Sequence, residues 1–308
     1  MGFIGIHLSK KLISNYKVYG IDIKDLNEYF KSKKKFIFNQ VSVLDYKRMD
    51  SLISKVDVVI HLAAIASPER YLTEPLKTMD ISALAAIEIA KICAKYKKLL
   101  VFSSTSEIYG NNKSLPYSES SDRVLGSTKT TRWCYSTSKS LVEHYIYALN
   151  QELGLKFIII RFFNVYGPFI EGRVIDKFIL NALKNKKITV YGDGKQTRCF
   201  LYVSDCINAI IKVLRSKNCI NDSFNIGNMQ QTSVNELLKK ILKFSNSGSK
   251  VEYLSYKKLK KNGYEDIYSR QPNNSHLVKS VKWKPQVSLD LGIQKTINFF
   301  KKNIKNYS

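Results

Sequence analysis

The feature that most constrains the fold of this chain is a set of short, nearly continuous apolar runs in its first half. Each run is rich in β-branched or aromatic residues. Such runs are typical of parallel strands that are buried on both faces of a sheet. They occupy residues 17–23, 57–64, 98–105 and 156–164.

Segments with helical spacing of their apolar residues stand between these runs, at 6–14, 75–96 and 136–153. Strands that alternate with helices predict a doubly wound α/β sheet. The pattern changes after Pro168, and we expect a domain at 1–168 followed by a smaller α/β domain at 169–308, interleaved with the first. The later expected elements are a Gly-Asp-Gly turn within 191–200, a helix from about Ser204, a strand near 223–228, and helices at 233–244 and from about Leu289.

Size and composition place the chain among globular proteins. It has 308 residues, of which 44% are hydrophobic, which allows a large core. The apolar runs are too short to span a bilayer and no cleavable signal pattern stands at the N-terminus, so we expect a cytoplasmic protein without a membrane partner. The cysteines are odd in number and show no C-x-x-C spacing, which indicates free thiols and no metal site. They are Cys93, Cys134, Cys199, Cys206 and Cys219.

The formal net charge of +25 raises the question of nucleic-acid binding. The lysines are spread along the whole chain, which is typical of an ordinary solvated surface. We therefore expect no nucleic-acid partner. A basic surface would also attract an anionic substrate.

The string "YSTSK" places Tyr135 and Lys139 four residues apart in a segment with helical spacing. Residues at this spacing lie on one face of a helix, so the ammonium group can lower the pKa of the phenol. A phenol tuned in this way can act as a general base. Taken alone, the same pair could be an ordinary surface pair.

Hydroxyl groups and a carboxylate end the buried run "VFSSTSEIYG" at Thr105, Ser106 and Glu107. In an open α/β sheet the carboxyl ends of the strands form the ligand crevice. These side chains are therefore candidates for substrate contact, and the alternative is that they cap the segment that follows.

Two glycines, Gly2 and Gly5, precede the first helical segment, and Asp22 follows the first apolar run. This order fits part of a dinucleotide-binding loop and an acidic residue that binds an adenosine ribose. A solvated loop aspartate is the alternative for Asp22. The small residues of "HLAA", His61 to Ala64, would let a cofactor pass close to the backbone.

The order and spacing of these motifs resemble those of the extended short-chain dehydrogenase/reductase family, and within it the NAD-dependent nucleotide-sugar epimerases, dehydratases and decarboxylases. The resemblance covers the whole chain. It implies a Rossmann-type domain, bound NAD, a nucleoside-diphosphate sugar (a UDP-sugar in the best-matching members) between two domains, and a homodimer. The motifs are Gly2, Gly5, Asp22, "HLAA", "SSTSEIYG", Tyr135 with Lys139, "RFFNVYGP" and "VYGDGKQTRCFLYV".

The resemblance also implies roles for single residues. Tyr135 would take the proton of the sugar 4-hydroxyl, Lys139 would hold the nicotinamide ribose, and Thr105 would bond the same hydroxyl. The implied cofactor contacts are Gly2, Phe3, Ile4, Gly5, Asp22, Asp45, Leu62, Ala63, Ala64, Ser103, Tyr135 and Lys139. The implied substrate contacts are Thr105, Asn164, Arg173, Tyr191, Arg198 and Arg270. Ser82 departs from the asparagine that relatives carry there, which puts the local hydrogen bonding in question.

All members of this group begin by oxidising C4 of the sugar. The 4,6-dehydratases carry aspartate where this chain has Ser106, and serine cannot readily replace that acid. The string Thr105-Ser106-Glu107 together with Arg270 resembles the UDP-glucuronate decarboxylases, so the catalytic set would be Thr105, Ser106, Glu107, Tyr135, Lys139 and Arg270. The alternatives are a UDP-sugar 4-epimerase and an inactive relic or nucleotide-binding protein.

Relatives read Gly-x-x-Gly-x-x-Gly after a complete first strand, and Gly2 and Gly5 match the second and third glycines. The first glycine and the strand that feeds it would precede Met1. That strand is central in a 3-2-1-4-5-6 sheet, and its loss leaves unpaired backbone edges. We therefore expect this chain to bind NAD weakly or to fold poorly.

Overall fold

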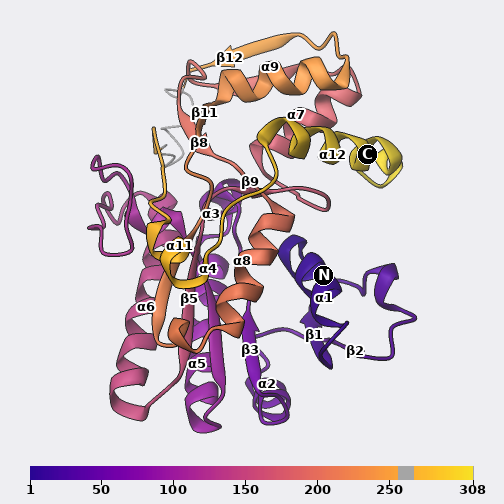
Figure 1. Ribbon diagram of the computed structural model, residues 1–308. Coiled ribbons are helices and arrows are strands. Elements are labelled where there is room, and N and C mark those ends of the chain that lie inside the picture. Colours follow the sequence, from indigo (N-terminus) through magenta and orange to yellow (C-terminus); the bar gives the residue numbers. More distant parts are fainter. Residues whose placement is uncertain (256–266, 308) are drawn as a thin grey trace.

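A computed structural model describes residues 1–255 and 267–307 (Figure 1). Its centre is a four-stranded parallel sheet in the order β10-β5-β4-β3. Register pairs Val58 with Leu99 and Leu100 with Phe157. The strands are β3 (Val58–His61), β4 (Leu99–Thr105), β5 (Phe157–Phe162) and β10 (Asp222–Ile226). This confirms the expected α/β class with a parallel sheet.

Helices cover both faces of this sheet (Figure 1). Side chains alternate along β4 and β5, because successive residues of a strand point to opposite faces. Phe102 and Ile159 pack with α2, α5 and α6, whereas Val101 and Ile160 join the core beneath α8. The helices are α1 (Phe3–Leu12), α2 (Tyr46–Ile53), α5 (Ala85–Lys95), α6 (Cys134–Leu153) and α8 (Val203–Arg215).

A second parallel pair, β1 (Val18–Asp22) with β2 (Phe36–Gln40), lies beside β3 but is not hydrogen-bonded to it. Among the described residues no strand lies between β1 and β3. Val58 of β3 is 40% exposed, whereas Val101 of β4 is 1% exposed. The sheet is therefore interrupted at the place where the sequence predicted that a central strand is missing.

The second lobe lies above the carboxyl ends of the central strands (Figure 1). β7 (Ile188–Tyr191) pairs with β12 (Val251–Leu254), and β8 (Thr197–Cys199) pairs with β11 (Gln231–Ser233). Its helices are α7 (Val174–Leu183), α9 (Val234–Ser245) and α12 (Leu289–Lys302). The chain returns to the central sheet through α8 and β10, so the two lobes are interleaved along the sequence.

Short elements complete the described chain. β6 (Val165–Tyr166) pairs with β9 (Leu201–Tyr202) where the lobes meet. The others are η1 (Glu28–Phe30), α3 (Pro68–Thr73), α4 (Pro75–Met79), η2 (Asp80–Leu84), η3 (Ser106–Tyr109), η4 (Thr131–Trp133), η5 (Lys217–Cys219), α11 (Ser275–Val281) and η6 (Ile304–Tyr307).

The expected single helix over 75–96 is wrong in one respect. A π-helical turn, η2, separates α4 from α5. This turn contains Ser82, whose buried hydroxyl has no hydrogen-bond partner among the described residues. A π-turn inserts one extra residue, which is common at functional sites. The local hydrogen bonding that the sequence put in question is indeed incomplete.

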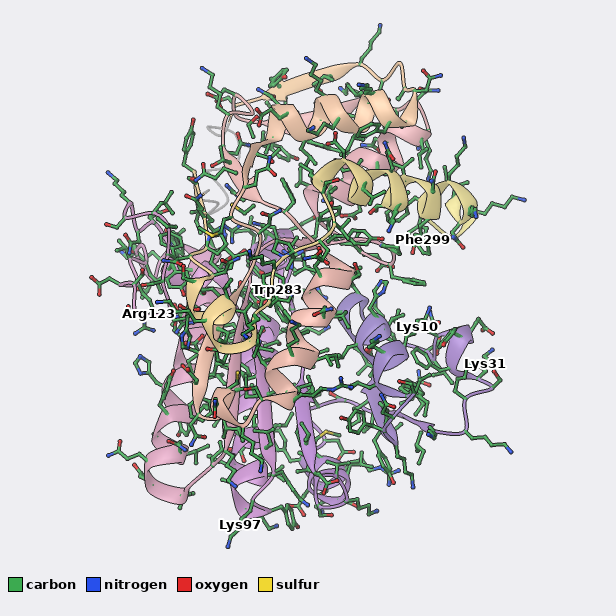
Figure 2. The ribbon with its side chains drawn as sticks, viewed as in Figure 1. Lys10, Lys31, Lys97, Arg123, Trp283 and Phe299 are labelled. Atoms are coloured by element: carbon green, nitrogen blue, oxygen red, sulfur yellow. The ribbon has the colours of Figure 1, made fainter. Side chains whose placement is uncertain are left out.

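The surface carries the basic residues on several sides. Figure 2 shows Lys31, Lys97 and Arg123 pointing outward, whereas Trp283 lies inside. The Trp283 indole donates a hydrogen bond to the Asp205 carbonyl at 3.1 Å. Within the described residues, no helix is long and apolar enough to cross a membrane.

The interrupted sheet generates a prediction about local stability. Backbone amides of β1 at Tyr19 and Ile21 should exchange with deuterium much faster than those of β4 at Val101 and Phe102, because β1 is paired along one edge only. Hydrogen exchange followed by mass spectrometry measures both segments in one sample. Equal protection of the two strands would contradict this account.

Candidate active site

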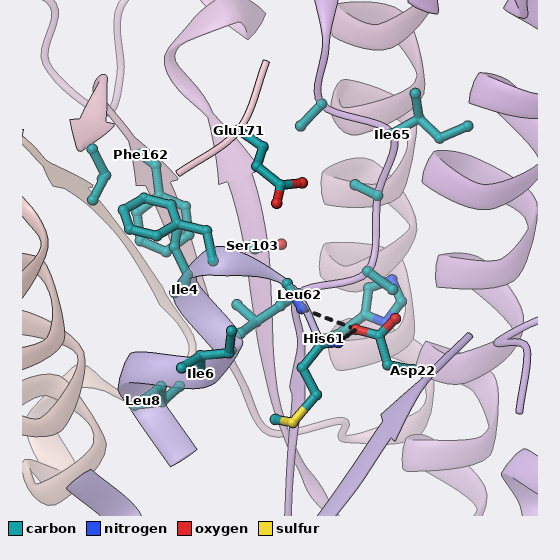
Figure 3. A pocket seen from close by; sticks show the side chains of 18 of the residues that line it. Ile4, Ile6, Leu8, Asp22, His61, Leu62, Ile65, Ser103, Phe162 and Glu171 are labelled. Atoms are coloured by element: carbon teal, nitrogen blue, oxygen red, sulfur yellow. Dashed lines mark hydrogen bonds and ion pairs between the residues drawn. The ribbon is translucent and has the colours of Figure 1, made fainter. Parts of the chain in front are cut away.

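A cavity of about 2330 Å³ opens at the carboxyl ends of the central strands, where His61, Thr105 and Phe162 line it. It continues beside α1 and β1 and is closed from above by residues of the second lobe. Figure 3 shows Asp22, His61, Ser103 and Glu171 around this cleft. The carboxyl-terminal edge of the sheet is the expected position of a ligand in an open α/β fold.

The structure brings nearly all the residues expected at the site to this cavity. Those that line it are Gly2, Phe3, Ile4, Gly5, Asp22, Leu62, Ala63, Ala64, Ser103, Thr105, Ser106, Glu107, Tyr135, Asn164, Arg173, Tyr191, Arg198 and Arg270. Lys139 is fully buried beneath it. Asp45 is not at the cavity, because its carboxylate accepts a hydrogen bond from the Arg48 amide at 3.0 Å and caps α2.

The amino end of α1 has the features of a dinucleotide site. Gly2 caps the helix, and apart from neighbouring residues of the same helix no described atom lies within 4 Å of a Cβ built on Gly2 or Gly5. Protein packing therefore does not explain these glycines, whereas a phosphate group close to a helix N-terminus does. Asp22 accepts hydrogen bonds from the Gly2 amide at 3.1 Å and the Lys24 amide at 2.9 Å, which holds its carboxylate beside the loop.

His61 supports the same assignment from the other side of the cavity. Its ring is 4% exposed and stacks on Phe102, and Nε2 has no partner among the described residues. Burial and the nearby Lys139 lower the pKa of His61 to about 3, so the ring is neutral. The open glycines and Asp22, together with His61 in the lining of the cavity, fit NAD as the bound cofactor.

Tyr135 and Lys139 lie one turn apart on α6, as the sequence predicted. The expected lowering of the Tyr135 pKa is wrong for this structure. Burial and the carboxylate of Glu107 raise the pKa of Tyr135, although Arg173 and a hydrogen bond with Thr105 oppose the rise. Lys139 Nζ donates to the Ser103 carbonyl at 2.8 Å and lies 6.0 Å from the Tyr135 ring centre, so it does not bond the phenol.

Burial also acts on Lys139 itself and lowers the pKa of its ammonium group to about 7. Glu143, one turn further along α6, opposes this by its negative charge. The Lys139 ammonium lies 4.5 Å from the centre of the Phe102 ring. Its charge is therefore sensitive to pH in the neutral range.

Glu107 lies between two arginines. Arg132 Nη1 donates to Oε2 at 2.7 Å, and Arg270 Nη1 lies 3.5 Å from Oε1 and 3.3 Å from the Ser106 hydroxyl. Burial would raise the pKa of Glu107, but the two guanidinium groups lower it to about 2. Glu107 is thus ionised at neutral pH, and two cations face one anion.

Sequence reasoning missed two residues of this cluster. Arg132 precedes Tyr135 by three residues in "RWCYSTSK", and that closeness was the available signal. Tyr71, within α3, is fully buried and stacks on Tyr135 with ring centres 4.7 Å apart. The guanidinium of Arg132 lies 5.6 Å from the Tyr71 ring. No sequence pattern pointed to Tyr71.

The second lobe supplies polar groups opposite this cluster. Arg173 caps α7, and Arg198 Nη1 donates to the Thr197 carbonyl at 2.8 Å and to the Tyr268 carbonyl at 3.2 Å. Asn164 has a positive φ of 37° and donates to the Cys199 carbonyl at 3.4 Å. Tyr191 is 44% exposed at the rim. Guanidinium groups suit phosphate oxygens, so this side can hold a diphosphate.

The fold and the cleft define a dinucleotide-dependent enzyme, and sequence comparison gives its family. Residues 1–227 match the model of the NAD-dependent epimerase/dehydratase family, and the chain belongs to that family. It is an NAD-dependent enzyme that modifies nucleotide sugars.

Two relatives illustrate the sequence similarity. The chain is 34% identical to the UDP-N-acetyl-α-D-glucosaminuronate decarboxylase of Bacillus cytotoxicus, over 97% of this chain and 95% of that protein. It is 30% identical to UDP-glucuronic acid decarboxylase 1 of Xenopus tropicalis, over 99% of this chain and 71% of that protein.

Solved structures confirm the Rossmann-type fold. The UDP-glucuronic acid 4-epimerase of Bacillus cereus, solved with UDP-glucuronic acid and NAD, superposes with a TM-score of 0.88 at 26% identity, covering 98% of this chain and 97% of that one. The UDP-glucose 4-epimerase of Thermotoga maritima, solved with UDP-glucose, gives the same TM-score at 27% identity and the same coverage.

The charge of Glu107 leads to a prediction about stability. Glu107→Gln leaves Arg132 and Arg270 buried without their carboxylate, which should cost about 3–5 kcal/mol of unfolding free energy at pH 7. The folded pKa of about 2 lies below the ordinary value of 4.5, so this contribution is complete above pH 4.5 and is lost as the pH falls towards 2. Urea denaturation of both proteins at pH 7 and pH 3 measures the difference.

At pH 3 the difference in unfolding free energy between wild type and variant should be clearly smaller than at pH 7. A gap that does not change with pH, or no gap at pH 7, would contradict the arrangement of charges described for Glu107.

Proposed function

We propose that this enzyme decarboxylates UDP-glucuronate. The observation that carries the proposal is the position of Arg270, which lines the cavity beside Tyr135 and lies 3.5 Å from Glu107 and 3.3 Å from the Ser106 hydroxyl. A guanidinium group in the lining of the cavity can bind a carboxylate of the sugar. Both relatives described above are named as decarboxylases of UDP-linked uronic acids, which supports the proposal.

The residues of the cleft fit the chemistry of such a reaction. Tyr135 would accept the proton of the 4-hydroxyl in its ionised form, which the positive charges of Arg173 and Arg132 favour against the effect of burial, and Thr105 would hydrogen-bond the same oxygen. NAD, when bound, supplies the acceptor for the C4 hydride. The resulting 4-keto sugar is a β-keto acid, so the bond between C5 and the carboxylate carbon can break and leave its electron pair in an enolate.

Within this proposal, Tyr135 carries the proton that it took from the 4-hydroxyl and donates a hydrogen bond to the C4 oxygen as negative charge grows there. Arg270 orients the departing carboxylate. Glu107, ionised beside it, holds Arg270 and Ser106 in place. Carbon dioxide leaves, C5 takes up a proton, and return of the hydride to C4 gives a UDP-pentose.

The second candidate is epimerisation at C4 of a UDP-sugar. The observation that favours it is the TM-score of 0.88 with two UDP-sugar 4-epimerases. In an epimerase of this kind the 4-keto sugar would have to rotate in the site, so that hydride returns to its opposite face. The guanidinium of Arg270 in the lining of the cavity favours an acidic sugar in either reaction.

The cofactor half of the cleft bears on activity. Asp22 lies on the β1–β2 pair and Ser103 lies on the four-stranded sheet, and these two sheets are not hydrogen-bonded to each other. We propose that this interruption between the sheets weakens NAD binding. For that reason a nucleotide-binding protein without catalytic activity is the alternative to an enzyme.

We also propose the division into domains at 1–168 and 169–308.

An assay of the purified protein with added NAD separates these functions. With UDP-glucuronate we expect carbon dioxide and a UDP-pentose, and with Tyr135→Phe we expect turnover to fall at least about a hundredfold because the proton acceptor is lost. Lys187→Ala is a matched control, because Lys187 pairs with Glu252 on the surface of the second lobe. A C4 epimer without loss of carbon would contradict decarboxylation.

We also propose a homodimer in the cytosol. Apolar side chains are exposed on the α4–η2–α5 segment and on α6, where Leu76, Leu84 and Leu141 are 72%, 53% and 44% exposed. Exposed apolar patches on packed helices are typical of protein interfaces. Five free cysteines fit a reducing compartment.

The dimer is tested by Leu84→Glu, which places a charge in the patch. Light scattering should give about twice the 35.4 kDa chain mass for the wild type and the single mass for the variant. Tyr253→Glu, at an exposed residue of the other lobe, is the control and should leave the mass unchanged. A wild-type monomer would contradict the proposal.

A further inference from the structure

We propose that Arg161 is a positioning residue that fixes the geometry of the active site from beneath it. Arg161 lies on β5 and is 7% exposed, and it does not line the main cavity. Its guanidinium makes four hydrogen bonds to three segments of the chain. Through these segments it reaches each element that carries a candidate catalytic residue.

The first connection is to α6. Arg161 Nε donates to Glu143 Oε1 at 3.1 Å and Nη2 donates to Oε2 at 2.6 Å, a two-pronged pair. Glu143 lies four residues after Lys139 and eight after Tyr135 on the same helix. The pair therefore fixes the rotation and height of α6 against β5. The negative charge of Glu143 also raises the pKa of Lys139 against the effect of burial.

The second connection is to η3, the turn that begins at Ser106. Arg161 Nη1 donates to the Tyr109 hydroxyl at 2.8 Å, and that hydroxyl donates to Asn225 Oδ1 at 2.7 Å. Tyr109 is fully buried. Only two residues separate it from Ser106, and Glu107 lies within the same turn. The position of Glu107 thus depends on where the Tyr109 ring is held.

The third connection leads to Arg270. Arg161 Nη1 also donates to the Glu119 carbonyl at 2.6 Å, in the segment that contains Tyr117. The Tyr117 amide donates to the Gln271 carbonyl at 2.8 Å, and the Asn273 amide donates to the Tyr117 carbonyl at 2.7 Å. These bonds enclose the segment that begins at Arg270.

Asn225 of β10 closes the network. Its side-chain amide donates to the Tyr117 carbonyl at 2.9 Å, while its backbone amide donates to Glu119 Oε1 at 2.7 Å. The rings of Tyr109 and Tyr117 stack with centres 4.7 Å apart. Removal of one member leaves buried donors unsatisfied, so the network holds one arrangement strongly. Lysine could not replace Arg161, because it lacks the planar fork.

The consequence rests on the proposed function. Tyr135 and Lys139 act at C4, whereas Glu107 and Arg270 face the sugar carboxylate, and Arg161 sets the spacing between these two groups. Weakening the contact between Arg161 and η3 should leave C4 oxidation intact but slow the loss of the carboxylate. Weakening the contact between Arg161 and α6 should slow C4 oxidation itself. A displacement of about 1 Å can cost about a hundredfold in rate.

Two near-isosteric variants test this, Tyr109→Phe on the η3 side and Glu143→Gln on the α6 side. For Tyr109→Phe we expect single-turnover formation of NADH within about twofold of wild type and release of carbon dioxide slower by about tenfold. For Glu143→Gln we expect NADH formation itself to fall by about tenfold. Tyr147→Phe is the control, since Tyr147 lies on α6 with its ring 42% exposed and outside the network.

Thermal unfolding of each variant shows whether it is folded. If Arg161 had a purely structural role, both variants would slow both steps equally, in proportion to their loss of stability, and that result would overturn the proposal. Wild-type rates in both folded variants would also overturn it. If the wild type turns over another UDP-sugar but not UDP-glucuronate, the proposed function fails on its own. The network is then tested by the same two variants, with release of that sugar's product in place of carbon dioxide.

Discussion

The parallel pairing of β3, β4, β5 and β10 is the constraint on which the rest of the structure depends. It brings the carboxyl ends of three of these strands to one edge, where His61, Thr105 and Phe162 line the same cavity. Helix α6 packs against the sheet and delivers Tyr135 to that edge, with Lys139 beneath. The second lobe adds Arg173 and Arg198 to the lining of the same cavity.

Electrostatic interactions give the ionisable groups of the cleft different charge states. Glu107 is ionised because Arg132 and Arg270 outweigh the cost of its burial, while burial raises the pKa of Tyr135 against the lowering effect of Arg173. Lys139 has a pKa near 7. One buried cleft therefore contains a fixed anion, a phenol with a raised pKa and an amine sensitive to pH.

Much of this was predictable from local patterns. The four apolar runs became β1, β3, β4 and β5 with ends that differ by at most three residues, because continuous apolar runs report burial on both faces. The interruption beside β1 was also predictable, since Gly2 opens α1 without a preceding strand. Motif spacing placed Thr105, Glu107 and Tyr135 at one edge.

The remainder depended on contacts between distant segments. Arg132, Tyr71 and the network around Arg161 join residues 18 to 156 positions apart, which no spacing rule covers. The pKa of Tyr135 was mispredicted because helical spacing indicated a neighbouring ammonium but not the burial of the phenol or the nearby carboxylate of Glu107, which raise the pKa. Asp45 was misplaced because an aspartate before a helix serves equally well as its cap.

The central claim is that Arg270 recognises a sugar carboxylate. The most direct measurement is calorimetric binding of UDP-glucuronate and UDP-glucose to the NAD-loaded wild type and to Arg270→Gln. The account predicts that the wild type binds UDP-glucuronate at least about tenfold more tightly and that the variant loses this preference. Equal affinities in the wild type, or a preference that persists in the variant, would contradict it.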